Sequence, residues 1–160
     1  MEKLNQILNH PLYKKHLADI EAFEKSRIFC GHDFQHFMDV SRIGYIYVLE
    51  KGLQINKEVV YGYGFLHDIG RAVEYNGGVS HELASVELAT LILKDTDYTG
   101  EEVQQIIAAI KNHRSRDGKD KISFEGLMYK ADKASRACWQ CPAEAKCNWD
   151  KEKKNIRVEV

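Results

Sequence analysis

Residues 64–71, GFLHDIGR, place a histidine and an aspartate side by side at the end of an apolar run that begins at Val59. Desolvating a carboxylate is costly unless a cation or hydrogen bonds compensate, so this pair requires an explanation. Imidazole and carboxylate together suit a divalent metal. The simpler alternative is a half-hydrated pair at a helix end, with His67 hydrogen-bonded to Asp68, and these residues alone favour it.

The composition indicates one globular domain with a core of its own. The chain has 160 residues, of which 44% are hydrophobic and 29% charged, and this balance favours neither disorder nor a membrane protein. The 23 basic and 24 acidic residues give a net charge of −1, which argues against a general nucleic-acid-binding surface.

The start of the chain and its cysteines bear on where the protein works. The opening, MEKLNQILNH, lacks the pattern of a signal peptide, and no apolar run reaches the length of a transmembrane helix. We therefore expect a cytoplasmic protein without a membrane partner. In that compartment the four cysteines are expected as thiols or metal ligands and not as disulfides.

Apolar residues recur at helical spacing almost throughout, and strand-like alternation is scarce, so we expect an all-α fold in one compact bundle. We expect residues 1–27 to pack on a core formed by residues 28–137, followed by a cysteine-containing segment with a charged tail, 138–160. Gly118 and its charged neighbours indicate a loop. Caps, breakers and periodicity predict helices over residues 2–9, 11–26, 33–51, 56–70, 80–94, 99–113 and 123–138.

Five of these helices carry a residue able to bind a metal on or beside the predicted apolar face. One buried histidine is usually a satisfied core residue, but five helices that share this feature are harder to dismiss. If the faces converge on one core, the polar groups meet there and need a common partner. The residues are His36, the pair His67 and Asp68, His81, His113 and Asp132.

The order His36, His67-Asp68, Asp132 resembles the HD-domain metal-dependent phosphohydrolases. The resemblance covers roughly residues 28–137 and includes LHDIGR after an apolar run and the stretch YKADK, residues 129–133. It implies that these four side chains bind a divalent metal inside a helical bundle.

Two further histidines match, in order and approximate spacing, those that bind a second metal in some HD families. They are His81 and His113, and the resemblance implies that Asp68 bridges the two ions. One or two ions of Mn, Fe, Co, Ni, Mg or Zn would suit such ligands. The alternative is that His81 caps its helix and His113 is merely buried.

The resemblance implies hydrolysis of a phosphate ester by a metal-activated hydroxide, with a nucleotide or another small phosphorylated molecule as substrate. Asp68 would act as the bridging ligand, and Arg71 and Lys133, which adjoin proposed ligands, would orient the phosphate. The same ligand order is similar to HD-type di-iron oxygenases, and a non-catalytic domain that binds a nucleotide is a third alternative.

A different pattern follows residue 137, where Cys138, Cys141 and Cys147 form C-x2-C-x5-C. Such spacing suits zinc or an iron–sulfur cluster, with Cys30 as a candidate fourth ligand. The alternative is three reduced thiols in a segment that Trp139 and Trp149 pack onto the bundle.

Overall fold

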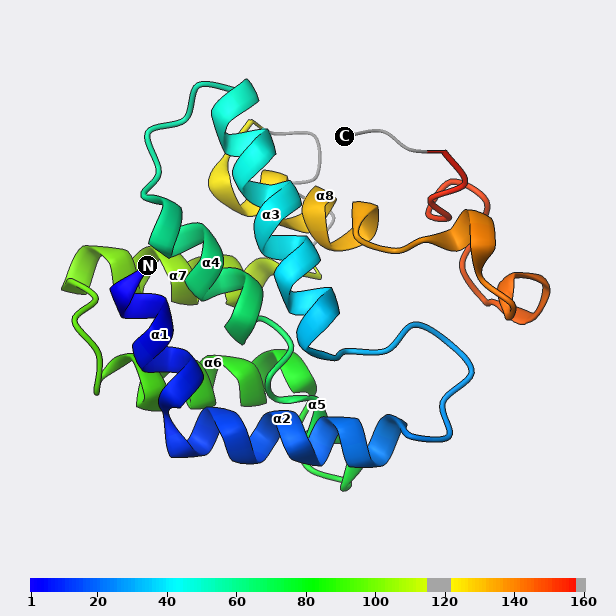
Figure 1. Cartoon of the computed structure of the whole chain (residues 1–160), viewed down its shortest axis with the longest axis horizontal. Helices are drawn as coiled ribbons and strands as arrows, with labels where there is room; N and C mark the ends of the chain where they lie inside the picture. The colour runs from blue at the N-terminus through cyan, green and yellow to red at the C-terminus, as the bar shows by residue number, and fades with distance from the viewer. Residues whose placement is uncertain (115–121, 158–160) are drawn as a thin grey trace.

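Helix α3, Phe34–Glu50, is the long central helix that packs against both α4, Lys57–Leu66, and α8, Phe124–Ala134. The computed structural model describes residues 1–114 and 122–157. Within these ranges every regular element is helical, which confirms the all-α prediction. Figure 1 shows α3 crossing the molecule between the helices of the middle of the chain and α8.

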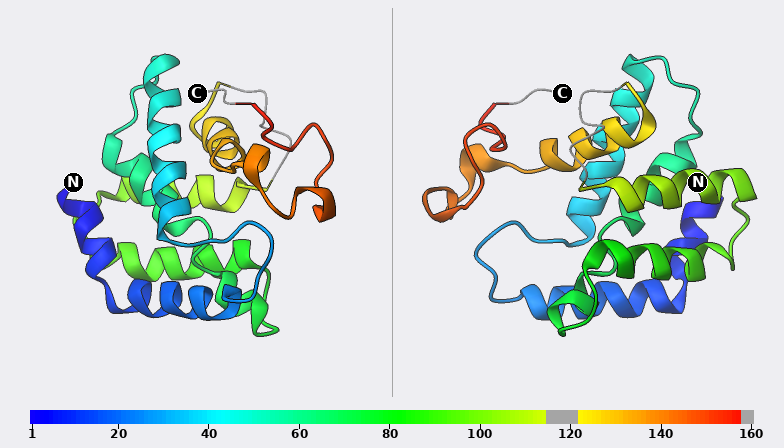
Figure 2. Two further views of the ribbon diagram at one scale, coloured as in Figure 1. Left: turned by 45° about the vertical axis from the view of Figure 1, so that its right-hand side comes forward. Right: turned by 180° about the vertical axis from the view of Figure 1, so that it is seen from behind.

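The other helices surround this centre. Helix α1 packs on α4, helix α2 packs on α5 and α6, and helix α7 contacts α4, α6 and α8. Figure 2 shows the segment after α8 on the same side of the bundle as the loop between α2 and α3. These elements are α1 (Glu2–Asn9), α2 (Pro11–Glu24), α5 (Arg71–Tyr75), α6 (His81–Leu93), α7 (Gly100–Asn112) and two short 3-10 helices, η1 (Cys138–Gln140) and η2 (Glu144–Lys146).

Side-chain caps fix the start of most of the long helices. The Asp33 carboxylate accepts a hydrogen bond from the backbone N–H of His36, 2.8 Å away, and so holds His36 in the first turn of α3. Thr99 and Glu102 form the predicted capping box of α7. Ser80 occupies the predicted N-cap position of α6, but its side chain makes no capping hydrogen bond there.

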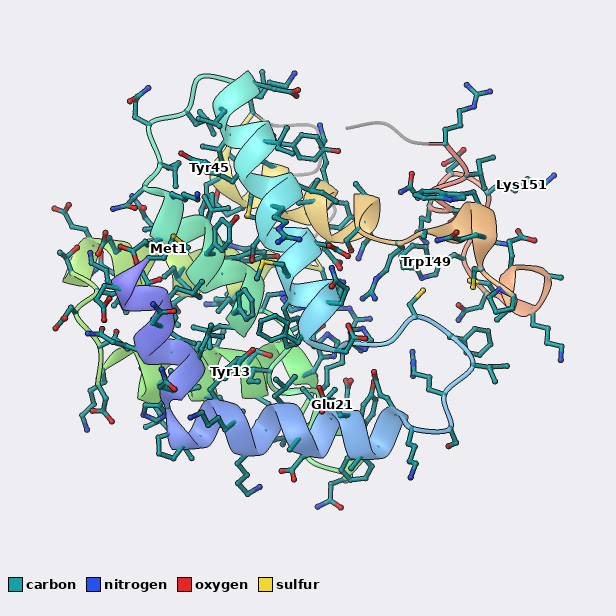
Figure 3. All side chains as sticks on the ribbon, in the orientation of Figure 1. Met1, Tyr13, Glu21, Tyr45, Trp149 and Lys151 are labelled. Carbon is teal, nitrogen blue, oxygen red and sulfur yellow. The ribbon has the colours of Figure 1, made fainter. Side chains whose placement is uncertain are left out.

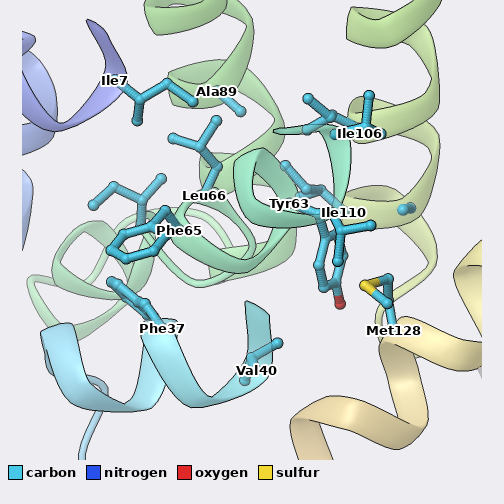
Figure 4. Packing of buried hydrophobic residues seen from close by; sticks show 14 of the residues in the cluster. Ile7, Phe37, Val40, Tyr63, Phe65, Leu66, Ala89, Ile106, Ile110 and Met128 are labelled. Atoms are coloured by element: carbon cyan, nitrogen blue, oxygen red, sulfur yellow. The ribbon is translucent and has the colours of Figure 1, made fainter. Parts of the chain in front are cut away.

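Helix α4 is buried along almost its whole length, because its apolar run faces neighbours on several sides. Tyr63, Phe65 and Leu66 are fully buried. Figure 4 shows Phe65 close to Phe37 of α3, while Tyr63 points to the side of α7 and α8. Burying each such side chain contributes roughly 1.5–3 kcal/mol. The core therefore carries the HD pair, which follows directly after α4.

Helix α8 ends at Ala134, so the predicted extension to Cys138 is wrong. The reason is a contact from far along the chain: the Asn155 side chain donates to the carbonyl oxygens of Ala134 and Arg136, at 2.8 and 3.0 Å. The Lys154 ammonium also lies 2.6 Å from the Glu144 carboxylate. The charged tail therefore contacts the segment that precedes it at least as far as Lys154. The predicted loop around Gly118 lies outside the described residues.

In the part of the chain that the structure describes, no helix has the length and apolar character needed to cross a bilayer.

Candidate metal centre

The structure brings all six predicted ligands together. Each comes from the end of a helix or the turn beside it, and none is more than 6% exposed. They are His36 in the first turn of α3, His67 at the C-cap of α4 with Asp68 in the next turn, His81 at the first position of α6, His113 at the C-cap of α7, and Asp132 in the last turn of α8.

The six side chains form two groups that share Asp68. In the first group the ligand atoms of His36, His67, Asp68 and Asp132 all lie within 4.8 Å of one another, and the same is true of Asp68, His81 and His113. Oδ2 of Asp68 lies 3.4 Å from Nε2 of His67. Its other oxygen, Oδ1, lies 3.4 Å from Nε2 of His81 and 3.6 Å from Nε2 of His113. Asp68 therefore has one oxygen directed to each group.

The histidines are oriented by hydrogen bonds from their outer ring nitrogens. Nδ1 of His67 lies 2.9 Å from the carbonyl oxygen of Gly64, and Nδ1 of His113 donates to the carbonyl oxygen of Ile110. Nδ1 of His81 lies 2.8 Å from a carboxylate oxygen of Glu74. These oxygens can only accept, so Nδ1 carries a proton in each ring, and Nε2 of each ring faces Asp68. Such outer partners are typical of metal-binding histidines.

The ring of His36 also directs Nε2 toward the other ligands, but its outer nitrogen contacts a hydroxyl group. Its Nδ1 lies 3.1 Å from the hydroxyl of Ser135, whose hydrogen is donated to the carbonyl oxygen of Asp132 at 2.7 Å. Nδ1 of His36 is therefore the donor, and its Nε2 lies 3.5 Å from Oδ1 of Asp132.

The charge state of the site suits a divalent cation. Burial lowers the pKa of His67 to about 4, which keeps this ring neutral. Burial alone would raise the pKa of Asp68, but Arg71 and the surrounding histidines together outweigh it and hold that pKa well below its ordinary value. Nε2 of His67 and Oδ1 of Asp68 are buried without a hydrogen-bond partner. A neutral His67 ring, two ionised carboxylates and buried acceptors without hydrogen bonds are donors that suit a divalent metal.

Both predicted phosphate-binding cations lie beside the ligands. Nε of Arg71 is 3.1 Å from Oδ1 of Asp68, and the Lys133 ammonium pairs with Asp132. The two cations line a cavity of about 360 Å³ together with Arg27, Arg136 and the Asp132 carboxylate. The side of the metal centre that opens to this cavity is therefore rich in positive charge.

Some residues of this cavity were not expected at the metal centre, among them Arg27, Arg136 and Trp149. Arg136 is four residues after Asp132, one helical turn further along the same face, and this spacing is a signal that could have identified it. Arg27 and Trp149 come from segments whose approach depends on the fold. The Trp149 ring, labelled in Figure 3, lies 5.5 Å from the Lys133 ammonium.

His32 is a further buried histidine at the centre. Its Nδ1 lies 2.6 Å from Oε1 of Glu24, and its Nε2 lies 3.6 Å from Oδ2 of Asp68. The spacing His32-x3-His36 was the available signal. No local feature of the sequence pointed to Glu24, at the end of α2, because its contact with His32 depends on how α2 packs.

Arg136 contacts the metal centre directly. Its guanidinium nitrogen Nη2 lies 2.9 Å from Nε2 of His36, and it also donates to the carbonyl oxygen of Gly31. A metal bound to Nε2 of His36 would need the lone pair that Arg136 uses in this structure. Metal binding therefore requires this one hydrogen bond to break.

One of the two tryptophans of the cysteine segment does not pack as expected. Trp149 packs on Lys133, but Trp139 is 48% exposed, so the expectation that Trp139 packs the segment onto the bundle is wrong. The four cysteines, Cys30, Cys138, Cys141 and Cys147, are free thiols.

A helical bundle with buried histidines and aspartates from five helices defines a class of metal-binding protein, and the comparisons with known proteins agree. The model of the HD domain family matches residues 33–137, well over half of the chain. The chain belongs to the HD domain family, whose members are generally hydrolases. It is similar to an uncharacterized protein of Clostridium beijerinckii, with 41% identity over 158 residues and 99% of each chain covered. No solved structure gives a significant match.

Proposed function

We propose that this protein is a metal-dependent phosphohydrolase, a phosphomonoesterase or phosphodiesterase, that acts on a nucleotide or another small phosphorylated molecule. One observation carries the proposal: two buried ligand groups that share Asp68 adjoin a cavity lined by four cationic side chains. His36, His67, Asp68 and Asp132 would hold one ion, and Asp68, His81 and His113 a second.

When bound, divalent cations supply a hydroxide nucleophile near neutral pH and polarise phosphoryl oxygens. The protein's own contribution is orientation and charge. Arg71 and Lys133 each contact a ligand carboxylate and face the cavity, so they can bind phosphoryl oxygens next to the metal groups. Such fixed cations stabilise the charge that builds up in the transition state.

His32 and Arg136 complete the cavity wall near the ligands. The Glu24 carboxylate fixes the proton of His32 on Nδ1, so the Nε2 lone pair can orient a water molecule by accepting its hydrogen. Arg136 can move its guanidinium from Nε2 of His36 to a phosphate oxygen once a metal takes the imidazole. The exchange replaces one hydrogen bond of Arg136 with a charge-assisted one.

The cavity also favours a substrate with a planar, apolar part. Phe29 and Trp149 line it together with the cations, and its volume of about 360 Å³ is in the range of small-molecule sites. Aromatic side chains stack on nucleobases, worth roughly 1–3 kcal/mol per base. These features support a nucleotide over a sugar phosphate.

The test is release of phosphate or of a nucleoside monophosphate by protein that has been stripped of metal and reloaded separately with each of the six candidate ions. Substrates would include nucleoside monophosphates, cyclic nucleotides and sugar phosphates. The variant Asp68→Asn should lower kcat by at least about 10²-fold. The matched control is Asp95→Asn, because Asp95 is an exposed aspartate that pairs with His10 away from the site.

Three outcomes would contradict the proposal. One is an absence of hydrolysis with every ion and substrate. Another is metal-dependent O₂ consumption by an iron-loaded protein that releases no phosphate, which would indicate an oxygenase. The third is tight nucleotide binding that leaves the nucleotide unchanged, which would indicate a non-catalytic sensor.

A further inference from the structure

Cysteines from two distant parts of the chain meet beside the metal centre. Cys30, in the loop between α2 and α3, lines a cavity of about 340 Å³ together with Cys138 and Cys141. Cys30 also lines the adjoining cationic cavity together with Cys147. The fold therefore brings Cys30 to the three cysteines of the C-x2-C-x5-C pattern.

The electrostatics of Cys30 agree with this proximity. Burial raises the pKa of its thiol, Arg136 lowers it, and the nearby thiols of Cys138, Cys141 and Cys147 raise it further. Reduced thiols gathered in this way are a common ligand set for soft metals.

The backbone of the segment consists of short turns that begin or end at the cysteines. The N–H of Cys141 donates to the carbonyl oxygen of Cys138 at 3.3 Å, and the N–H of Cys147 donates to that of Glu144 at 3.1 Å. The first of these turns joins Cys138 to Cys141, at the spacing of metal-binding C-x2-C loops.

The segment has very little hydrophobic core of its own. Between residues 138 and 157, the buried residues are Cys138 and Ala143, while Trp139 and Ile156 are more than 45% exposed. Short segments of this kind are usually held by a metal or a covalent link, because apolar burial cannot fix them. Hydrogen bonds of Asn155 and the contact of Trp149 with Lys133 are the other fastenings.

The arrangement of the cysteines bears on the choice between a cluster and a single ion. A zinc ion bound tetrahedrally at a Zn–S distance of about 2.3 Å would bring its sulfur ligands within about 3.8 Å of one another. In residues 1–114 and 122–157, the groups whose ligand atoms all lie within 4.8 Å of one another consist of histidines and carboxylates, and cysteines do not take part. Three of the cysteines are among the residues that line a cavity of about 340 Å³.

We propose that Cys30, Cys138, Cys141 and Cys147 bind a [4Fe–4S] cluster that fastens the C-terminal segment to the loop between α2 and α3. Four cysteine thiolates are the ligand set of such clusters, and the cavity beside three of these cysteines has room for a cluster. The cluster is a structural fastening in this proposal and takes part in no electron transfer.

A cluster at the cysteines would also hold residues that line the cationic cavity. Arg27 donates to the carbonyl oxygen of Cys30 at 2.9 Å, and Arg136 donates to that of Gly31. Trp149 is two residues after Cys147. A cluster at the four cysteines would therefore fix the position of three residues of the cavity wall relative to the HD centre. These residues are Arg27, Arg136 and Trp149.

The proposal is tested by anaerobic purification of the full chain, with separate assays of iron, acid-labile sulfide and zinc. The expected result is about four sulfide ions and at least about four irons per chain, with broad visible absorption. Sulfide is the decisive quantity, since iron bound at the HD centre brings no sulfide. About one zinc per chain without sulfide, or metal-free protein with four titratable thiols, would overturn the proposal.

Variants separate the two centres. Cys30→Ser should lower the sulfide content by more than half, whereas Asp68→Asn should leave it unchanged and remove only metal at the HD centre. A Cys30→Ser protein with full sulfide content would exclude Cys30 as a ligand and overturn the four-cysteine site.

Limited trypsin digestion tests whether the cluster holds the C-terminal segment against the loop between α2 and α3. Cys30→Ser should keep the helical circular dichroism of the wild type but be cut faster at Lys146 and Lys151 of the segment. Equal rates in the two proteins would contradict the fastening role. If the variant fails to fold, the sulfide content of the wild type still decides whether the cluster exists.

Discussion

Nε2 of His67 lies 3.4 Å from Oδ2 of Asp68, and neither atom has a proton to give the other. The ring proton of His67 is on Nδ1, which donates to the carbonyl oxygen of Gly64, and burial keeps the ring neutral by lowering its pKa to about 4. Two acceptors held face to face in the interior repel each other unless a cation lies between them. The adjacent pair in the sequence is thus not a hydrogen bond at a helix end, and a shared metal ion would satisfy both acceptors.

The low pKa of His67 predicts a pH-dependent stability of the metal-free protein. The folded ring protonates near pH 4 and the unfolded ring near pH 6.5, so between these values the unfolded state binds more protons. The free energy of unfolding should therefore fall as the pH drops from 6.5 to 4, by about 3 kcal/mol from this residue. Above pH 6.5 this contribution is complete and constant.

The measurement is urea unfolding of chelator-treated protein at several pH values, with His67→Gln as the comparison. The wild type should lose about 3 kcal/mol more than the variant across the window. Parallel pH profiles for the two proteins would show that His67 is not held neutral by its surroundings.

Gly70 allows the turn after the HD pair to lie directly on the start of α6. A Cβ at this position would come within 2.7 Å of both the Ala84 side chain and the carbonyl oxygen of His81. Gly70→Ala should therefore lower the unfolding free energy by about 1–3 kcal/mol, because the backbone of α6 has to shift. It should also weaken metal binding through the displaced His81.

The control is Gly100→Ala, since a Cβ at Gly100 meets nothing within 4 Å. Its unfolding free energy should change by no more than about 0.5 kcal/mol. Equal effects of the two substitutions in thermal or urea unfolding would contradict the close contact at Gly70.

Removing the Arg136 side chain should change metal binding and substrate binding in opposite directions. Arg136→Met removes the hydrogen bond to Nε2 of His36 and one positive charge from the cavity. We expect tighter binding of the metal and a KM for the phosphorylated substrate raised about tenfold, equivalent to about 1.4 kcal/mol. The kcat should change less than KM, because Arg71 and Lys133 are unchanged.

Arg114→Met is the matched control, since Arg114 is exposed and pairs with Glu82 outside the cavity. It should alter neither quantity. Weaker metal binding by Arg136→Met, with an unchanged KM, would show that Arg136 supports the metal ligands and has no part in binding the substrate.

Local patterns in the sequence predicted the long helices, but not the short helix α5, and the residues that meet at the centre. The periodicity put His36, His113 and Asp132 on apolar faces, and apolar faces converge when helices form one core. Caps such as Asp33 and Thr99 are equally local, because the hydrogen bonds they accept come from residues three positions away.

Contacts between distant segments were beyond such reasoning. The end of α8 depends on Asn155, which is 21 residues further along the chain than Ala134. The pairing of His32 with Glu24 depends on how α2 lies against the centre. The meeting of Cys30 with the C-terminal cysteines likewise required the fold, since no local spacing relates these positions.

Anomalous X-ray scattering from crystals loaded with Mn²⁺ tests directly whether two metal groups share Asp68. We expect two peaks in the wild type, one among His36, His67, Asp68 and Asp132 and one among Asp68, His81 and His113. In His81→Gln only the second peak should be lost, and in Asp68→Ala both should be lost. Peaks away from these residues, or an Asp68→Ala protein that retains both, would show that Asp68 is not a shared metal ligand.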